Sequence, residues 1–187
     1  MNFNKHSDLI GQHAFLGASK YHWLNYDKDK VIQAYLNSMA SERGTELHDI
    51  AAKLIKFGIK QPSRPKSTFG MYVNDAIAYR LTPEQPLYFS RNCFGTADAI
   101  SYNEKTHFLR IHDLKTGVTT PHIEQLEIYA ALFCLEYHIQ PKDITIELRI
   151  YYNNDVQISN PGADTIKHIM QKIIEFDAEI EKLRAEE

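Results

Sequence analysis

Cysteine is scarce in this chain, and both a long apolar run and an excess of basic residues are missing. The 187 residues include 2 cysteines, Cys93 and Cys134, which stand among apolar neighbours and lack any CxxC-type spacing. Two thiols are too few for a four-cysteine iron–sulfur cluster, and their spacing argues against a zinc site. They favour buried free thiols in a reducing compartment.

The first residues are polar and mixed, and no apolar run follows that would suit a signal peptide or a membrane span. We therefore expect no membrane association and a location in the cytoplasm of a bacterium or of an infected host cell. The formal net charge of -3 lacks the basic excess typical of nucleic-acid-binding proteins. Overall charge averages over the chain, however, and a metal site also needs acidic residues, so this charge does not exclude a nucleic-acid partner.

The composition, 43% hydrophobic and 11% aromatic over 187 residues, predicts one globular domain spanning residues 1–187. A short helix is expected after Ser19, which together with Lys20 and His22 is a weak candidate for phosphate contact. A longer helix is expected over 31–57, broken near residues 38–41 and stopped by Gly58. Its buried stripe is predicted to consist of Leu47, Ile50, Ala51, Leu54 and Ile55.

From residue 85 the pattern changes to the alternation of strands. Strands are predicted over 87–90, 94–102 and 107–115, forming an antiparallel meander with a turn at 103–106. A helix is predicted after Gly117 and Pro121, then a strand over 144–152, a second one over 156–159, and a last helix from about residue 164. This order predicts an α+β or α/β fold around a small mixed sheet.

Two aspartates and a lysine are the strongest candidates for chemistry. Alternation along 107–115 places Asp113 and Lys115 on one side of the strand end, and antiparallel pairing brings Asp98 beside Asp113. Two carboxylates so close repel each other unless a cation or a proton joins them, and hard oxygen ligands suit Mg²⁺ or Mn²⁺. The alternative is a buried ion pair between Lys115 and one of the aspartates. Leu114 points away from this side, but its carbonyl oxygen is a further candidate ligand.

Polar residues on two predicted helices can join this group. His48 follows Gly44 at a four-residue step, and a small residue one turn away allows another backbone to approach the histidine. Gln125 and Tyr129 are one turn apart and share a face, just after the strand that ends in Lys115. Taken alone, His48 is more typical of a packing residue than of a metal ligand, and the pair is more typical of a solvated face.

Four motifs occur in the order found in one nuclease group. They are Gly44-Thr45-Glu46-Leu47-His48, Gly95-Thr96-Ala97-Asp98, Asp113-Leu114-Lys115-Thr116-Gly117 and Gln125-x-x-x-Tyr129. In these motifs the sequence resembles the RecB-like branch of the PD-(D/E)XK nuclease superfamily, in particular a small phage-type exonuclease. The resemblance spans residues 44–129, and it implies a restriction-endonuclease-like α-β-β-β-α-β core.

The resemblance also implies roles for the residues of these motifs. His48, Asp98, Asp113 and the Leu114 carbonyl would ligate Mg²⁺ or Mn²⁺, and Asp98, Asp113 and Lys115 would carry the catalysis. Gln125 and Tyr129 would contact DNA. Some relatives hold an iron–sulfur cluster through four cysteines, which this chain lacks.

The function expected on this basis is metal-dependent hydrolysis of phosphodiester bonds in DNA recombination, repair or phage DNA processing. Expected partners are DNA, a single-strand annealing or other recombination protein, and a second copy of the chain. Three alternatives stay open: an endonuclease of the same superfamily, such as a junction resolvase or a restriction-type enzyme; a catalytically inactive DNA-binding module; and a structural domain in which the acids and Lys115 form an ion network.

Overall fold

The computed structural model describes residues 14–16, 18–117 and 122–186. The chain divides into two compact units, Met1–Thr45 and Glu46–Glu187. The first unit contains a 3₁₀ helix, η2 (Ala18–Asn25), and the beginning of the long helix α1 (Lys28–Phe57). Within it the Phe15 and Tyr35 rings meet edge to face, with their centroids 5.2 Å apart. All residues of the predicted site belong to the second unit.

A five-stranded mixed sheet forms the centre of the second unit. Its strands are β1 (Thr82–Ser90), β2 (Cys93–Asn103), β3 (Phe108–Leu114), β4 (Thr145–Tyr152) and β5 (Asp155–Ser159), and they lie side by side in that order. The predicted antiparallel meander is confirmed, since β1 pairs with β2 and β2 with β3 in antiparallel register. β3 and β4 are parallel, and β4 and β5 are antiparallel.

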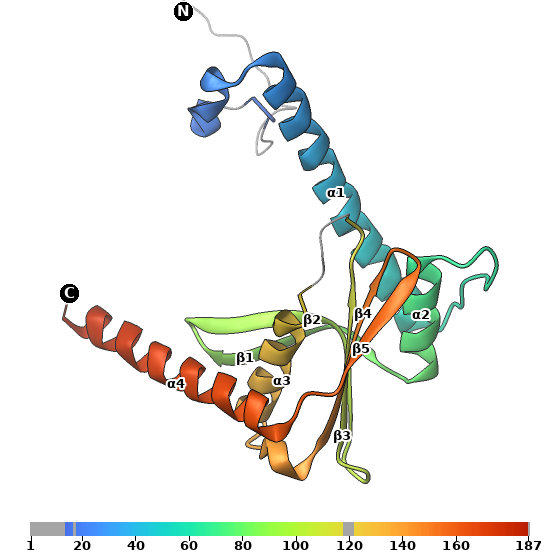
Figure 1. The fold of residues 1–187 in the computed structure, drawn as a ribbon, viewed down its shortest axis with the longest axis vertical. Coiled ribbons are helices and arrows are strands. Elements are labelled where there is room, and N and C mark those ends of the chain that lie inside the picture. Colours follow the sequence, from blue (N-terminus) through green and yellow to red (C-terminus); the bar gives the residue numbers. More distant parts are fainter. Residues whose placement is uncertain (1–13, 17, 118–121, 187) are drawn as a thin grey trace, which may run out of the picture. The chain divides into compact units, whose positions relative to one another are not determined.

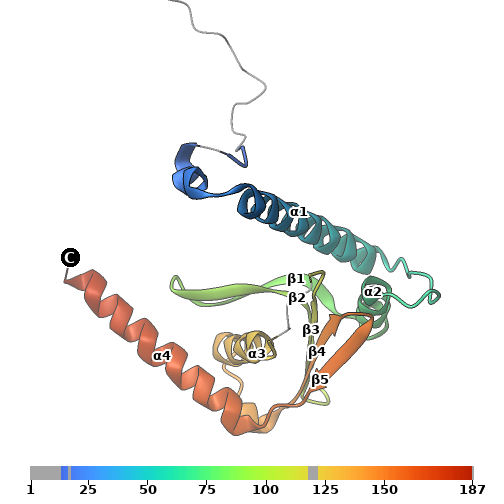
Figure 2. The same cartoon turned by 45° about the horizontal axis from the view of Figure 1, so that its top comes forward.

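Helices cover both faces of this sheet. Figure 2 shows α3 (Glu124–Glu136) in the corner between the β1–β2 hairpin and strands β3 to β5, whereas α2 (Thr68–Ala78) lies on the other side of those strands. The α3 side holds the larger apolar cluster, which includes Leu109, Ile111 and Leu126. The smaller cluster joins α2 to Ala51 and Ile55 of α1. The short η3 (Pro141–Asp143) and the long α4 (Ala163–Ala185) complete the unit (Figure 1).

Local sequence determines where several elements begin and end. The Ser67 side chain caps α2 by accepting a hydrogen bond from the Gly70 amide. The β2–β3 turn is held by Asn103, whose side chain accepts hydrogen bonds from the backbone amides two and three residues ahead. Asn153 and Asn154 form the two-residue turn between β4 and β5 with φ values of 46° and 57°. Asparagine tolerates this left-handed conformation well, which explains why these two residues suit the turn.

Two predictions for α1 are wrong. The helix runs without a break through residues 38–41. A polar side chain in this region bonds within the helix, since the Thr45 hydroxyl donates to the Ser41 carbonyl one turn earlier, so that polar residues here need not end it. The predicted buried stripe is also too long, because Leu47 and Ile50 are 37% and 47% exposed while Ala51 and Ile55 are buried.

The short helix predicted after Ser19 corresponds to η2, but the side chains of Ser19 and Lys20 lie outside the described residues, as does Pro121. The described His22 side chain is exposed, and its ring contacts that of Tyr21 at a tilt of 35°. Within the described ranges, no helix combines the length and the apolar character needed to cross a membrane.

Candidate metal centre

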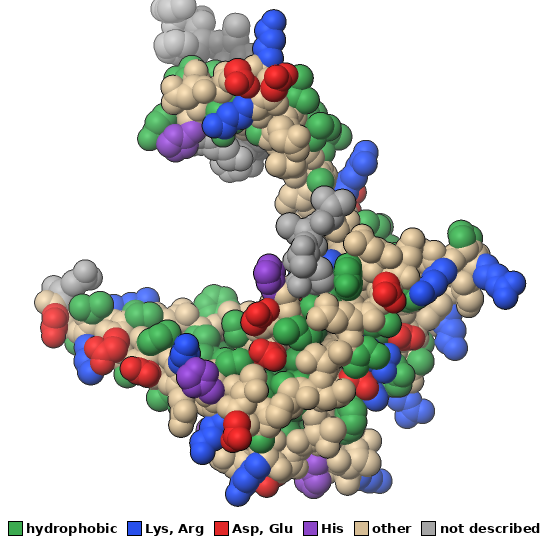
Figure 3. Space-filling view, in the orientation of Figure 1, with side chains coloured by type: hydrophobic (Ala, Val, Ile, Leu, Met, Phe, Trp, Pro, Cys, Tyr) green, Lys and Arg blue, Asp and Glu red, His purple; other side chains and the backbone are tan. Residues whose placement is uncertain are grey.

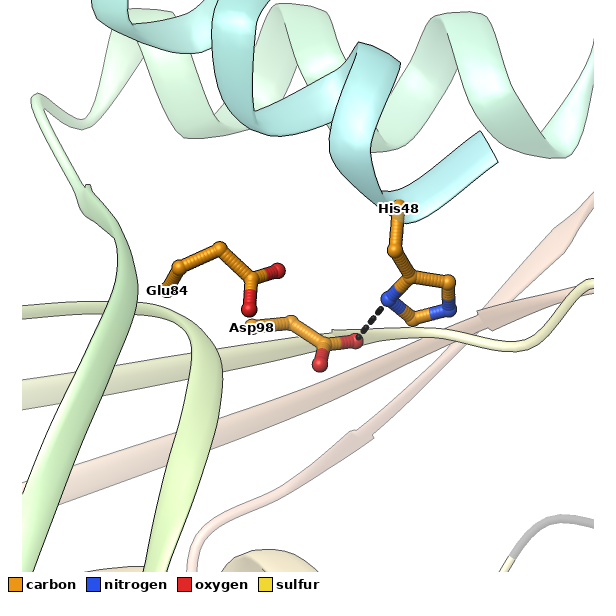
Figure 4. A group of neighbouring side chains, drawn as sticks. All are labelled: His48, Glu84 and Asp98. Atoms are coloured by element: carbon orange, nitrogen blue, oxygen red, sulfur yellow. Dashed lines mark ion pairs between the residues drawn. The ribbon is translucent and has the colours of Figure 1, made fainter. Parts of the chain in front are cut away.

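Three side chains from three separate elements meet at one point of the second unit. His48 comes from α1, Glu84 from β1 and Asp98 from β2, and Figure 4 shows the imidazole and the two carboxylates pointing toward one another. One ligand atom of each lies within 4.8 Å of the others. The His48 Nδ1 atom is 3.3 Å from Asp98 Oδ2. The predicted pair of His48 and Asp98 is therefore in direct contact.

Asp113 and Lys115 lie beside this group at the end of β3. The Lys115 ammonium is 3.0 Å from Asp113 Oδ1 and 2.9 Å from Asp113 Oδ2. It also donates to Gln125 Oε1 at 2.8 Å, and the Gln125 amide group donates to the Tyr129 hydroxyl at 3.4 Å. The predicted polar face of α3 thus reaches the strand end, where it orients the lysine.

Backbone geometry joins the two aspartates. In the β2–β3 ladder Ala99 is opposite His112, so one further step places Asp98 opposite Asp113. The backbone N–H of Leu114 donates to Asp98 Oδ2 at 2.9 Å. The Leu114 side chain is buried, as alternation predicts, while its backbone contacts the site.

Glycine at position 95 is required by the packing of α3 on β2. A Cβ atom at this position would lie 2.9 Å from Cε1 of Tyr129, which is closer than such contacts allow. Gly95 therefore lets the Tyr129 ring lie against the strand, and this fixes the side of α3 that carries Gln125. The glycine of the Gly95-Thr96-Ala97-Asp98 motif thus has a packing role.

Negative charge is crowded here, and the pKa values respond to it. Burial and the nearby Asp98 carboxylate raise the pKa of Asp113 above its usual range, while Lys115 opposes this shift. Burial and the charge of Asp98 likewise raise the pKa of Glu84. The hydrogen bond to Asp98 raises the pKa of His48 in spite of partial burial. Each of these shifts means that a positive charge or a proton is favoured at the site.

Glu84 is the one member of the cluster that the sequence analysis missed. It lies in a segment flanked by Pro83 and Pro86, before residue 87, where the first strand was predicted to begin. Its φ of 50° is in the left-handed region, which is uncommon for a residue without glycine's freedom. The signal that would have revealed it is its register: Pro83 pairs with Ala99 and Gln85 with Ala97, so Glu84 falls opposite Asp98.

These donors fit a hard divalent cation. Carboxylate oxygens and an imidazole nitrogen converge, and they outnumber the positive charges beside them. Asp113 is 2% exposed, and the Lys115 ammonium lies 2.9 Å from its Oδ2 atom. This one ammonium also contacts Oδ1 of the same buried carboxylate, so it does not balance the three carboxylates of the site. Glu46, the acidic residue of the first motif, is exposed on α1 and is not a member of the His48–Glu84–Asp98 group.

Comparison of the sequence with models of known protein families gives no match. Comparison with curated proteins gives none either.

Proposed function

We propose that this protein is a metal-dependent DNA nuclease that hydrolyses phosphodiester bonds, with the centre at the end of β3 as its active site. The observation that carries this proposal is the convergence of Asp98, Asp113 and Lys115 with His48 and Glu84, where three carboxylates stand beside one lysine and one histidine. An excess of hard, negatively charged ligands beside a fixed lysine suits a phosphate substrate that arrives with Mg²⁺ or Mn²⁺.

The order of elements supports the proposed restriction-endonuclease-like core. A helix precedes three antiparallel strands, a helix follows, and the next strand returns parallel to the third. This order agrees with the α-β-β-β-α-β core that the resemblance implies, and it supports the proposal. The proposed site residues also come to one place, although they are separated by up to 81 positions, from His48 to Tyr129.

In the proposed mechanism His48, Glu84, Asp98, Asp113 and the Leu114 carbonyl hold the metal. When bound, the metal ion supplies Lewis acidity and makes a water molecule more acidic. Lys115 keeps its ammonium at the strand end, where it orients the attacking water and stabilises negative charge on the phosphate.

Residues of α3 complete the proposed site. Gln125 holds the lysine in place through its Oε1 atom, while Tyr129 braces α3 against β2. Gln125 is exposed and Tyr129 is half-buried, and the two are joined by a hydrogen bond from the Gln125 amide group to the Tyr129 hydroxyl. Both are proposed to contact the DNA strand.

The test is digestion of DNA by the purified protein with Mg²⁺ or Mn²⁺. Asp113→Ala is expected to abolish cleavage, and Lys115→Ala to lower kcat by roughly 10²- to 10³-fold, as for other lost stabilisers of developing negative charge. Lys142→Ala and Asp143→Ala on η3 are matched controls, because both residues are exposed and are not part of the site. Undiminished cleavage by a folded Asp113→Ala protein would refute the proposal.

The same digestion separates an exonuclease from an endonuclease. With end-labelled linear DNA and closed circular DNA as substrates, an exonuclease releases nucleotides from the linear form alone. A junction resolvase or restriction-type enzyme cuts the circle. An inactive DNA-binding module binds either form without releasing product.

A further inference from the structure

Two aromatic rings lie stacked at the surface of the β1–β2 hairpin. Tyr88 and Phe94 are cross-strand partners with ring centroids 6.4 Å apart and an angle of 28° between the ring planes. Their residues are 50% and 67% exposed. Figure 3 shows hydrophobic side chains at the surface over this hairpin, next to acidic ones. Aromatic faces that remain in water at this extent are available to a ligand.

These rings are on the face of the hairpin that carries the metal cluster. Along β2, Phe94 and Thr96 are exposed whereas Gly95 and Ala97 pack toward α3, so alternation places Asp98 on the side of Phe94. Along β1, residues 84, 86 and 88 are exposed in the same way. The side chains of one hairpin face therefore run in order from the carboxylates to the aromatic pair.

The distance between the two features suits several nucleotides of an extended strand. Phe94 is four residues from Asp98, which corresponds to about 13 Å at the rise of a β-strand. The row between them consists of Pro86 and Thr96, which are cross-strand partners and bear no charge. A phosphate backbone that passes from the metal centre toward the rings therefore meets no carboxylate on that row.

Hairpin stability does not depend on this pair alone. The hairpin tip is tied to α4 by Asp177, which accepts hydrogen bonds from the Ser90 hydroxyl and the Asn92 amide group. The Asn92 amide group also donates to Glu181. The contribution of one exposed cross-strand aromatic pair to a sheet is small, so the tip keeps its anchor when one ring is replaced.

We propose that Tyr88 and Phe94 form a stacking platform for the bases of an unpaired nucleic-acid strand whose backbone enters the metal centre. This inference rests on the proposed nuclease function and specifies its substrate as single-stranded. Bases in a duplex are stacked on one another and cannot lie on protein rings, whereas unpaired bases can. Stacking also needs no excess of basic residues, which agrees with a net charge of -3.

The experiment measures binding of fluorescent oligo(dT) strands of increasing length by anisotropy, with Ca²⁺ in place of Mg²⁺ so that the strands stay intact. For strands long enough to cover about 13 Å, Phe94→Leu and Tyr88→Leu are each expected to weaken binding about tenfold, and Phe94→Trp is expected to keep or tighten it. For a dinucleotide, which reaches only the metal centre, all variants should match the wild type. Tyr137→Leu is the matched control, since Tyr137 is 51% exposed and stacks on Phe133 in α3.

Several results would overturn the inference. One is unchanged binding of long strands by the folded Phe94→Leu protein, and another is an equal loss for the dinucleotide. Preferential binding of a blunt duplex by the wild type would also refute it. So would a change of sedimentation behaviour in the leucine variants without a change in binding, because the rings would then serve contact with a second copy.

Parallel digestion with Mn²⁺ distinguishes failure of the aromatic platform from failure of the nuclease function. If the wild type cleaves DNA but the ring variants bind and cleave long single strands as well as it does, the platform is wrong and the nuclease stands. If the wild type binds single strands through the rings but cleaves nothing, the nuclease assignment fails and the platform stands.

Discussion

Two groups of charged side chains lie along the central strands, and their charge balance differs. The arginine cluster consists of Asp75, Arg110, Glu147 and Arg149. In it each carboxylate meets a guanidinium: Glu147 lies 2.7 Å from Arg110 and 2.9 Å from Arg149, and Asp75 lies 3.3 Å from Arg149. The acidic cluster consists of His48, Glu84, Asp98, Asp113 and Lys115, where three carboxylates face one lysine and one histidine.

The pKa values express this difference. Burial alone would raise the pKa of Glu147, but the hydrogen bonds from Arg110 and Arg149 bring it below its usual value. In the acidic cluster the pKa values of Glu84 and Asp113 are raised instead. The arginine cluster is thus balanced by its own residues and typical of a structural ion network, whereas we expect an added cation to stabilise the acidic cluster. This contrast argues against the alternative in which Lys115 and the acids form only a structural network.

The largest effect is expected from breaking the balanced cluster. Glu147→Ala leaves two arginines with side chains 22% and 12% exposed without their shared carboxylate. We expect a loss on the order of 3 kcal/mol in the free energy of unfolding, because Arg110 loses the carboxylate it pairs with and Arg149 keeps only the longer contact to Asp75. Urea unfolding measures it, with Glu104→Ala in the exposed β2–β3 turn as control. A loss no larger than that of the control would mean that the arginine cluster is not structural.

The next effect is stabilisation of the wild type by metal. A site that binds Mn²⁺ only in the folded state adds about 2.7 kcal/mol at a hundredfold excess over Kd. Because protons compete for His48, Glu84 and Asp113, whose pKa values are raised, this gain should shrink as the pH falls. Thermal unfolding with and without Mn²⁺ measures it. A gain that persists in Asp98→Asn would place the metal elsewhere.

A smaller effect of opposite sign is expected from relieving the acidic cluster. Asp98→Asn removes the charge that raises the pKa of Asp113 and Glu84 but keeps an oxygen to accept the Leu114 N–H. Without metal we expect the variant to be as stable as the wild type or up to about 1 kcal/mol more stable, while cleavage is lost. Clear destabilisation in EDTA would show that the acidic cluster is balanced after all.

Alternation and helical spacing predicted all five strands in outline, together with α3, α4 and the end of α1, because most of these elements bury one face. The same rules placed Asp98, Asp113 and Lys115 together, since ladder register follows from the short turn at Asn103. They did not predict the first part of β1 around Glu84, because this residue has a left-handed backbone and lies between two prolines, both unusual in a strand. They also failed within α1, where serines looked like a break, and at Phe94 and Tyr88, whose exposure no spacing reveals.

The last expected effect concerns the pH dependence of stability and two histidines, His48 in the acidic cluster and His112 beside the arginine cluster. The hydrogen bond to Asp98 raises the pKa of His48 above 6.5, so its contribution to stability is full below pH 6.5 and is lost as the pH rises through the raised value. Burial, with Arg149 and Arg110 nearby, lowers the pKa of His112 well below 6.5. Its contribution is therefore present above pH 6.5 and is lost as the pH falls.

Together the two shifts predict a maximum of metal-free stability near pH 6.5, with opposite causes on its two sides. His48→Gln should flatten the alkaline side and His112→Phe the acid side, each by no more than about 1.4 kcal/mol per pH unit, the limit for one proton. Urea unfolding in EDTA between pH 5 and pH 8, where histidines titrate, measures how the free energy of unfolding changes with pH in the wild type and in both variants. If both substitutions reduced the pH dependence on the same side of the maximum, the pKa values of the two histidines would be shifted in the same direction. The proposed difference in charge balance between the two clusters would then be wrong.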